Sequence, residues 1–429
     1  MPGMNLEGKN EILTKIKTWL ICATIFFIIF NFLVLGSISI IMLTSVWFFE
    51  GSLKSKWELL RKDYLFIAYA IYFLIELLGI FLAPDIITGW KNVETKLGFI
   101  VLPIIFCSSN FVDETVRRNI LLSLSITMTI ALLYCLIINT GQYFQTHDPN
   151  LFFYHTLLDP LDQHAVYYSV FIFISLLFLL LPDHIHPWLK KHVWVRIIWI
   201  SFFFIFIYLL ASKLVLVVLV CFLALMLGKL FFKRFRKWQA ILLAVIAVLL
   251  VSSVFIFDNP VRKRFSDILK MNREQLINEK YTQGDYFNGM EFRVLLWGIT
   301  YHLLKEKDAF VFGVGAANTQ SLLSEKYQRM GMYVGNKQKG DPGYLDYNCH
   351  NQLLQISLQA GIVGLAVFLF WCIALGKRVL ERKDSMLTAI LCLIFVFFLT
   401  ESVFEREIGM LLCTVFPLLF LYPRRAMSR

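Results

Sequence analysis

Residues 349–365 read CHNQLLQISLQAGIVGL. A histidine and an asparagine here precede an apolar helical pattern that contains two glycines. On a helix with 3.6 residues per turn, Gly361 and Gly364 fall about 20° and 40° either side of the azimuth of His350. Small residues on one face allow a second helix to pack closely in a membrane. The stretch therefore predicts an imidazole at the mouth of a helix, above a smooth groove for another helix.

The composition extends this helical pattern to the whole chain. Hydrophobic residues make up 58% of the sequence and charged residues 17%, and the mean hydropathy is +0.67. Apolar runs of nearly 20 residues recur, which is typical of membrane-spanning helices. The net charge of +11 does not indicate nucleic-acid binding, because the basic residues gather in short loops between apolar runs. We predict an all-α polytopic membrane protein.

We expect about twelve transmembrane helices. The first apolar run lacks a small-residue cleavage site and leads directly into the next run, so we interpret it as a retained helix. The short second and fourth runs could be tilted or re-entrant. The candidate spans are residues 16–34, 36–49, 64–83, 97–109, 119–140, 164–181, 193–210, 212–231, 239–257, 351–375, 385–400 and 407–422.

Charge asymmetry between loops predicts the orientation. Alternate loops carry 24 Lys and Arg residues, against 4 in the short loops of the opposite set. The positive-inside rule then places both termini in the cytoplasm. Residues 258–349 form one long segment on the outer, periplasmic face and should be structured. The expected organisation is nine spans in 1–257, a large periplasmic loop at 258–349, and three spans in 350–429.

The long loop carries its own helical signals. Asn288-Gly289-Met290 is a turn signal ahead of a helix. From Glu291 to Lys307 apolar residues recur at helical spacing, which predicts an amphipathic helix with Arg293 and Trp297 four residues apart. Phe312-Gly313-Val314-Gly315 then predicts a glycine-rich turn.

An ordered set of motifs spans about 75 residues of this region. It consists of Arg293-x-x-x-Trp297, then Phe312-Gly313-Val314-Gly315, then His350-Asn351-x9-Gly361-x-x-Gly364. This order resembles the O-antigen ligase/polymerase superfamily of membrane glycosyltransferases. The late position of the large outer loop also fits that superfamily.

The resemblance implies specific roles. The loop histidine, His350, would be the catalytic or acceptor-positioning residue, and Arg293 would bind the lipid pyrophosphate of an undecaprenyl diphosphate-linked glycan. Lys213 stands where the superfamily commonly has a second arginine, and a lysine cannot form the bidentate fork with phosphate. The favoured activity is O-antigen ligation to lipid A–core in the bacterial inner membrane. O-antigen polymerase and protein O-oligosaccharyltransferase remain alternatives from the same superfamily.

Elementary chemistry supports the same residue types. A histidine has a pKa of about 6.5 and can take a proton from an acceptor hydroxyl near neutral pH. Fixed positive charge stabilises a departing diphosphate. The outer loop lacks a DxD-type carboxylate pair, and none of the eight cysteines forms a CxxC motif. We therefore expect an inverting enzyme with no metal and no cofactor. Cys349 is a weaker candidate, as a catalytic thiol.

Further residues are candidates for substrate binding, each with a plainer alternative. Asn351 and Trp297 belong to the motifs given above and are candidates for contact with the substrate. Arg262 and Arg264 follow the ninth span and could anchor lipid headgroups or bind the donor. His164 is the first residue of a predicted span and could line a cavity that holds the substrates. Glu401 lies in a short outer turn, where it could form a local ion pair or line the acceptor site.

Two more interpretations stay open. Glu76 lies within an apolar span, so it should pair with a cation from a neighbouring helix or line a polar cavity. A twelve-helix transporter or flippase is the alternative from a different functional class. No pair of broken helices in matching halves favours it.

Overall fold

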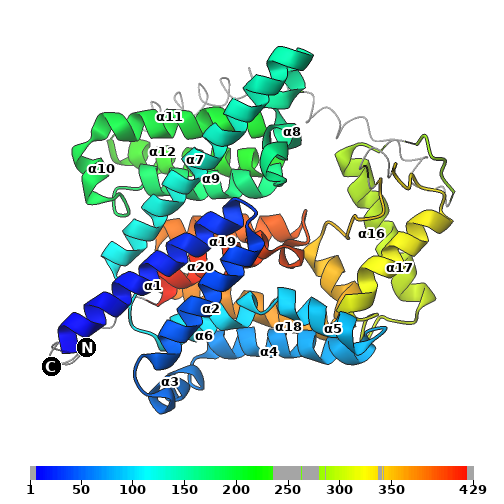
Figure 1. The fold of residues 1–429 in the computed structure, drawn as a ribbon, viewed down its shortest axis with the longest axis horizontal. Coiled ribbons are helices and arrows are strands. Elements are labelled where there is room, and N and C mark those ends of the chain that lie inside the picture. The colour runs from blue at the N-terminus through cyan, green and yellow to red at the C-terminus, as the bar shows by residue number, and fades with distance from the viewer. Residues whose placement is uncertain are drawn as a thin grey trace. The chain divides into compact units, whose positions relative to one another are not determined.

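A computed structural model of the chain describes residues 6–234, 262, 280–285, 287–336, 341 and 343–422. Every regular element in these residues is a helix, and one isolated bridge pairs Asn336 with Asp341. The all-α class is confirmed (Figure 1). The predicted span at 239–257 and the candidate Arg264 lie outside the described residues.

Several helices meet the requirements for crossing a membrane. Two further bent pairs, 33–49 with 53–60 and 154–161 with 165–180, could each form one span, which gives up to seven in the described part of the chain. Four shorter apolar helices fall on other predicted runs, so the count of twelve remains a prediction. The five long helices are Asn10–Ile29, Tyr64–Leu82, Glu114–Thr146, Val193–Leu210 and Gln352–Arg382.

The chain divides into two compact units, residues 1–42 with 112–269 and residues 43–111 with 270–429. In unit 1, helix α7 packs against α1 and α9, and α9 packs against α11 and α12. A left-handed residue, Ala211, joins α11 to α12 (φ 44°), so α12 begins at Lys213 as the second helix of a tight pair. The helices of unit 1 are α1 (Leu6–Ile29), α7 (Glu114–Thr146), η2 (Pro149–Phe152), α8 (Tyr154–Leu158), η3 (Asp159–Leu161), α9 (Ala165–Leu180), α10 (Pro187–Lys191), α11 (Val193–Leu210) and α12 (Lys213–Arg234).

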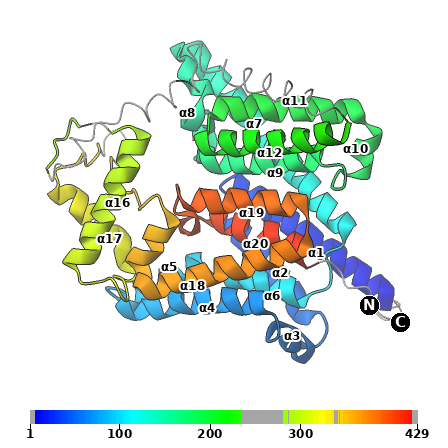
Figure 2. The same ribbon diagram turned by 180° about the vertical axis from the view of Figure 1, so that it is seen from behind.

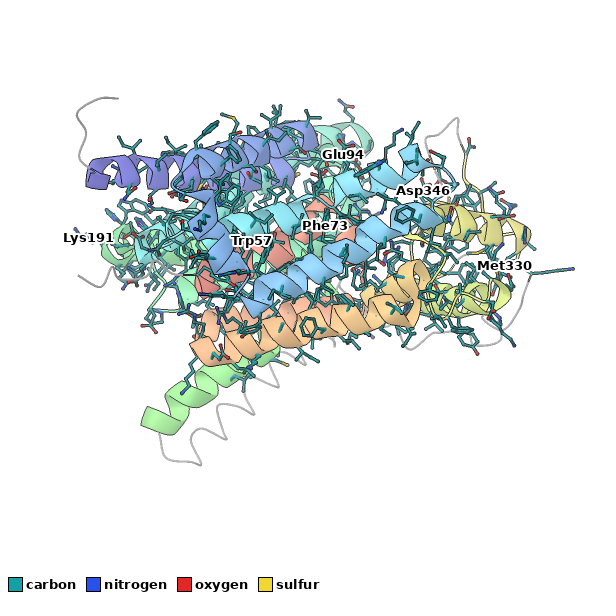
Figure 3. All side chains as sticks on the ribbon, turned by 90° about the horizontal axis from the view of Figure 1, so that it is seen from below. Trp57, Phe73, Glu94, Lys191, Met330 and Asp346 are labelled. Atoms are coloured by element: carbon teal, nitrogen blue, oxygen red, sulfur yellow. The ribbon has the colours of Figure 1, made fainter. Side chains whose placement is uncertain are left out.

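Helix α2 (Leu33–Phe49) begins in unit 1 and ends in unit 2. In unit 2, α4 lies beside α18, and α6 lies beside α20 (Figures 1 and 2). The other helices are α3 (Leu53–Leu60), α4 (Tyr64–Leu78), η1 (Gly79–Leu82), α5 (Ile86–Thr95), α6 (Gly98–Ser108), α16 (Gly289–Glu306), α17 (Ala316–Arg329), α18 (Gln352–Arg382), α19 (Ser385–Phe398), η5 (Val403–Glu405) and α20 (Glu407–Leu421). Figure 3 shows their side chains, with Phe73 marking α4 and Trp57 marking α3.

Aromatic side chains fill the centre of unit 2. Phe404, from the short helix η5, lies 4.7 Å from Phe99 and 5.6 Å from Trp371, measured between ring centroids. The side chain of Phe404 is buried against rings from α4, α6, α18 and α19. Aromatic pairs at such separations stabilise a core beyond the burial of their area. The turn between α19 and α20 is therefore anchored inside the helix bundle.

The predicted helix in the long loop is confirmed as α16. Asn288 forms a capping box with Glu291, because its side chain accepts two backbone hydrogen bonds and Glu291 accepts the Asn288 N–H. The predicted apolar face is buried in a cluster with residues of α17, Cys349 and Leu358. The helix therefore has the start and the buried face that its sequence predicts.

Helix α18 differs from the expected smooth, continuous helix. His350 lies two residues before it, and the helix is broken at Ala360 and Gly361, where Gly361 has φ 62°. The segment 310–315 fills the break: Val314 N–H donates to Leu358 O at 2.8 Å, and Ile362 N–H donates to Phe310 O at 2.8 Å. The predicted groove for a second helix is wrong at Gly361, because that glycine receives a loop backbone instead.

Candidate active site around His350

His350 occupies a constrained backbone position. Its φ of 45° is in the left-handed region, which a residue with a Cβ rarely adopts. The His350 N–H donates to Asn348 Oδ1 at 3.0 Å, and Asn351 caps α18 by accepting the Leu354 N–H. Backbone positions of this kind concentrate at functional sites. The left-handed conformation thus sets His350 apart from the helix that follows it.

The imidazole is paired with a buried carboxylate. His350 Nδ1 lies 2.9 Å from Glu401 Oε2. The side chain of Glu401 is only 6% exposed and that of His350 15% exposed. The contact at Nδ1 therefore restricts the orientation of the ring. The carboxylate that makes this contact comes from the turn between α19 and α20.

Arg293 holds the other oxygen of the same carboxylate. Its Nη2 lies 2.6 Å from Glu401 Oε1, across 108 residues of sequence. Arg293 Nε also donates to Thr400 O, and Nη1 donates to Gly289 O. Each guanidinium nitrogen therefore has an acceptor. The expected local ion pair of Glu401 is replaced by a long-range arrangement that joins α16, His350 and the α19–α20 turn.

A row of buried glutamines on α18 holds that turn, and the sequence analysis did not single it out. Gln352 Oε1 accepts the Phe404 N–H, and Gln355 Oε1 accepts the Cys349 N–H at 3.2 Å. Gln359 donates to Glu405 at 2.9 Å. The spacing of 352, 355 and 359 places all three on one helix face. Three buried amides at that spacing in an apolar helix are the signal that could have identified them.

A second ion cluster lies at the other end of the same turn. Lys96 Nζ is 3.0 Å from Glu76 Oε2 and 3.5 Å from Glu405 Oε1. Tyr72 also donates its hydroxyl to Glu76. Burial alone would lower the pKa of Lys96, but the Glu405 and Glu76 carboxylates outweigh it and hold the pKa above its ordinary value. The predicted pairing of Glu76 with a cation is confirmed.

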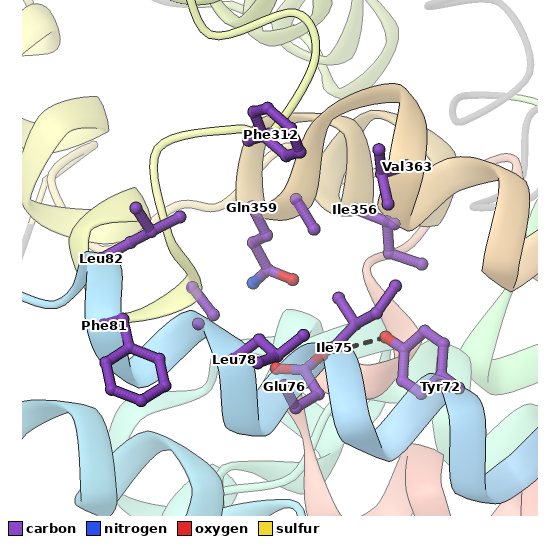
Figure 4. Close-up of a pocket in the computed structure, with 13 residues that line it drawn as sticks. Tyr72, Ile75, Glu76, Leu78, Phe81, Leu82, Phe312, Ile356, Gln359 and Val363 are labelled. Carbon is purple, nitrogen blue, oxygen red and sulfur yellow. Dashed lines mark hydrogen bonds between the residues drawn. The ribbon is translucent and has the colours of Figure 1, made fainter.

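Glu76 also lines a pocket of about 290 Å³ between α4, η1 and α18 (Figure 4). The walls are mostly apolar, whereas a polar cavity was one of the expectations for Glu76. Figure 4 shows the amide of Gln359 projecting into the same space, with Phe312 at its rim. The lining residues are Tyr72, Ile75, Glu76, Leu78, Gly79, Phe81, Leu82, Phe312, Ala316, Ile356, Gln359, Ala360 and Val363.

Cys349 does not have the properties of a catalytic thiol. Its side chain is completely buried, and its sulfur lies 3.2 Å from Thr300 Oγ1. Burial raises the pKa of the Cys349 thiol to about 12. A thiol with that pKa is protonated at neutral pH, so it is a poor nucleophile.

The remaining candidates divide between the two units. Trp297 lies half-buried on α16, and its indole N–H has no acceptor within the described residues. Lys213 begins α12, His164 precedes α9 with its ring 4.2 Å from that of His155, and Arg262 is exposed. These last three belong to unit 1, so their approach to His350 remains a prediction.

Comparison with known families gives one match. Residues 197–369 match the family model described as O-antigen ligase. The matched region includes Lys213, Arg293 and His350, and it ends before Glu401. No curated protein matches the chain. The match covers less than half of the chain, and over that region it supports the resemblance to the O-antigen ligase superfamily.

Proposed function

We propose that the chain is an O-antigen ligase-type membrane glycosyltransferase that transfers a glycan from undecaprenyl diphosphate to lipid A–core. The reaction takes place at the periplasmic face of the bacterial inner membrane. The observation that carries this proposal is the Glu401 carboxylate, which joins His350 to Arg293. A histidine oriented by a buried carboxylate is a suitable general base for a hydroxyl group.

The proposed chemistry uses His350 as the base. When His350 carries its ring proton on Nδ1, this N–H forms a hydrogen bond with the Glu401 carboxylate, and Nε2 keeps its lone pair. Nε2 then accepts the proton of the acceptor hydroxyl as that oxygen attacks the anomeric carbon. The bond from this carbon to the diphosphate oxygen breaks, and the electron pair leaves with undecaprenyl diphosphate. Glu401 stabilises the imidazolium that forms.

A single displacement of this kind inverts the anomeric centre and needs no covalent glycosyl-enzyme. The energy comes from the diphosphate leaving group, which is already activated. Cations that offset its charge stabilise the transition state. Arg293 and Lys213 are the proposed diphosphate ligands. Arg293 has five N–H hydrogens and donates three of them to described residues, which leaves two that could bind phosphate oxygens.

The pocket beside α18 supports a lipid-linked donor. It opens between two helices that can span a membrane, and its walls are largely apolar. Gln359 on this pocket lies about 10 Å along the helix axis from Gln352, at a rise of 1.5 Å per residue. The pocket is therefore the proposed slot for the isoprenoid chain of the donor beyond its first units. Arg262 and Arg264 are proposed to hold its headgroup region.

Acceptor binding is proposed for the polar residues around the imidazole. Asn351 lies beside His350 and donates to Leu399 O at 3.2 Å, which places it on the α19–α20 turn. Trp297 is half-buried, and the apolar face of its ring suits a sugar ring. His164 is the corresponding proposal from unit 1.

The test replaces His350 by alanine in a strain that depends on the variant. Loss of O-antigen-bearing lipopolysaccharide at a normal protein level is expected. His302→Ala is the matched control, because His302 is an exposed histidine on α16. Normal O-antigen attachment by the His350→Ala variant would remove the catalytic proposal.

The glycan left in a deletion strain separates the related activities. Loss of a ligase leaves lipid-linked polymer and bare core, whereas loss of a polymerase leaves core with a single repeat unit. In proteoliposomes, a ligase joins the lipid-linked glycan to added lipid A–core and releases undecaprenyl diphosphate. A transporter would instead move substrate without forming a glycosidic bond.

A further inference from the structure

The turn at residues 399–406 carries two carboxylates with different partners. Glu401 contacts His350 and Arg293, whereas Glu405 contacts Lys96 and Gln359. Only three residues separate the two glutamates. A movement of Glu405 is therefore transmitted to Glu401 through a very short piece of backbone.

That piece of backbone has little freedom. Phe404 is inserted in the aromatic core, and its N–H donates to Gln352 Oε1 at 2.9 Å. Ser402 Oγ lies 3.5 Å from Gln355 Oε1, which also accepts the Cys349 N–H next to His350. The turn and the histidine thus share supports on one face of α18.

Lys96 supplies the cation at the far end of this arrangement. Its side chain is 4% exposed, and it joins the α5–α6 junction to α4 through Glu76 and to the turn through Glu405. One cation against two carboxylates leaves a net charge of −1 in a largely buried cluster. Removing the lysine would leave two carboxylates facing each other without compensation, which is strongly unfavourable.

We propose that Lys96 is a positioning residue that fixes the His350–Glu401 pair by holding Glu405, and thereby the turn that carries both glutamates. The catalytic consequence of this role rests on the proposed function. The geometric part, the orientation of the imidazole, can be measured without any transfer reaction.

The decisive variant is charge-balanced. Lys96→Met alone leaves two unpaired carboxylates and can fail to fold, so Lys96→Met is combined with Glu76→Gln. The double variant keeps the cluster charge at −1 and lets Glu405 keep Gln359. We expect near wild-type thermal unfolding but a kcat lower by about 100-fold, the order expected for a displacement of 1 Å. Lys91→Met, at an exposed lysine of α5, is the matched control.

The second measurement is the rate at which diethyl pyrocarbonate modifies His350, followed by mass spectrometry. Glu401→Ala gives the rate for an imidazole without its carboxylate partner. The double variant should approach that rate, several-fold above wild type. A wild-type modification rate, or a wild-type kcat at restored stability, would overturn the positioning role. A wild-type protein that transfers no glycan would instead overturn the proposed function, while the modification rate still tests Lys96.

Discussion

Glu401 Oε2 lies 2.9 Å from His350 Nδ1, and the two residues are 51 positions apart in sequence. The carboxylate therefore favours a proton on Nδ1 and leaves Nε2 as the nitrogen that the proposed mechanism uses as the base. The second oxygen of Glu401 is bound by Arg293, so the negative charge is already partly compensated before any substrate binds. One buried acid thus orients the proposed base and fixes a cation next to it.

Glu401→Gln should lower kcat by about 100-fold, because the amide cannot stabilise an imidazolium and Arg293 loses its counter-charge. Binding of the donor lipid should change much less. Initial rates with purified protein and lipid-linked glycan measure both quantities. Glu325→Gln, at an exposed carboxylate on α17, is the control. A kcat within the range of the control would show that His350 does not need its partner.

The break in α18 gives a prediction about stability. A Cβ on Gly361 would overlap the Val311 carbonyl, and a Cβ on Gly313 would overlap the backbone at Gln359 and Ala360. Both glycines also have positive φ. Gly361→Ala and Gly313→Ala should therefore each destabilise the protein by more than about 1 kcal/mol.

Thermal unfolding in detergent measures this effect. Gly298→Ala is the matched control, because a Cβ there meets no atom and Gly298 lies within helix α16. That change should be neutral or stabilise by about 0.5–1 kcal/mol. Equal melting temperatures for all three variants would contradict the docking of segment 310–315 into the break.

The sequence predicts the features that depend on local pattern. The start of α16 follows from Asn288 and Glu291, and its buried face follows from the spacing of its apolar residues. His350 and Arg293 are recognisable because each belongs to a short motif. The apolar runs predict helices, although their lengths alone do not fix how many cross the membrane.

Long-range partners escape the same reasoning. In the sequence Lys96 is only one of the charges in a short loop, yet it forms ion pairs with Glu76 and Glu405 from other elements. A glycine at position 361 is compatible both with close helix packing and with a helix break. Which of the two occurs depends on segment 310–315, about 50 residues earlier in the chain. Such pairings depend on tertiary packing, which a periodic pattern does not encode.

The pocket beside α18 predicts a dependence on donor tail length. Val363→Trp should fill it and raise the KM for a long-chain donor by about 10-fold, which corresponds to 1.4 kcal/mol and is less than the burial of two methylene groups. A donor with a very short prenyl chain should be unaffected. Ile373→Trp, at an exposed position on the same helix, is the control. Equal effects on long and short donors would place the lipid chain elsewhere.

Arg293→Lys separates the charge of this residue from its geometry. Arginine reaches Thr400 O, Gly289 O and Glu401 at once from three nitrogens, whereas a lysine has a single nitrogen on a flexible stem. The lysine can keep the ion pair with Glu401, but it cannot also hold the two carbonyls and a diphosphate. We therefore expect kcat/KM for the donor to fall by about 10- to 100-fold, a loss of about 1.4–2.8 kcal/mol of transition-state stabilisation. Arg329→Lys, in an exposed pair with Glu325, should leave the rate unchanged. Full activity of Arg293→Lys would mean that only the positive charge matters at this position, and the fork-shaped contact with Glu401 and Thr400 would then have no part in donor binding.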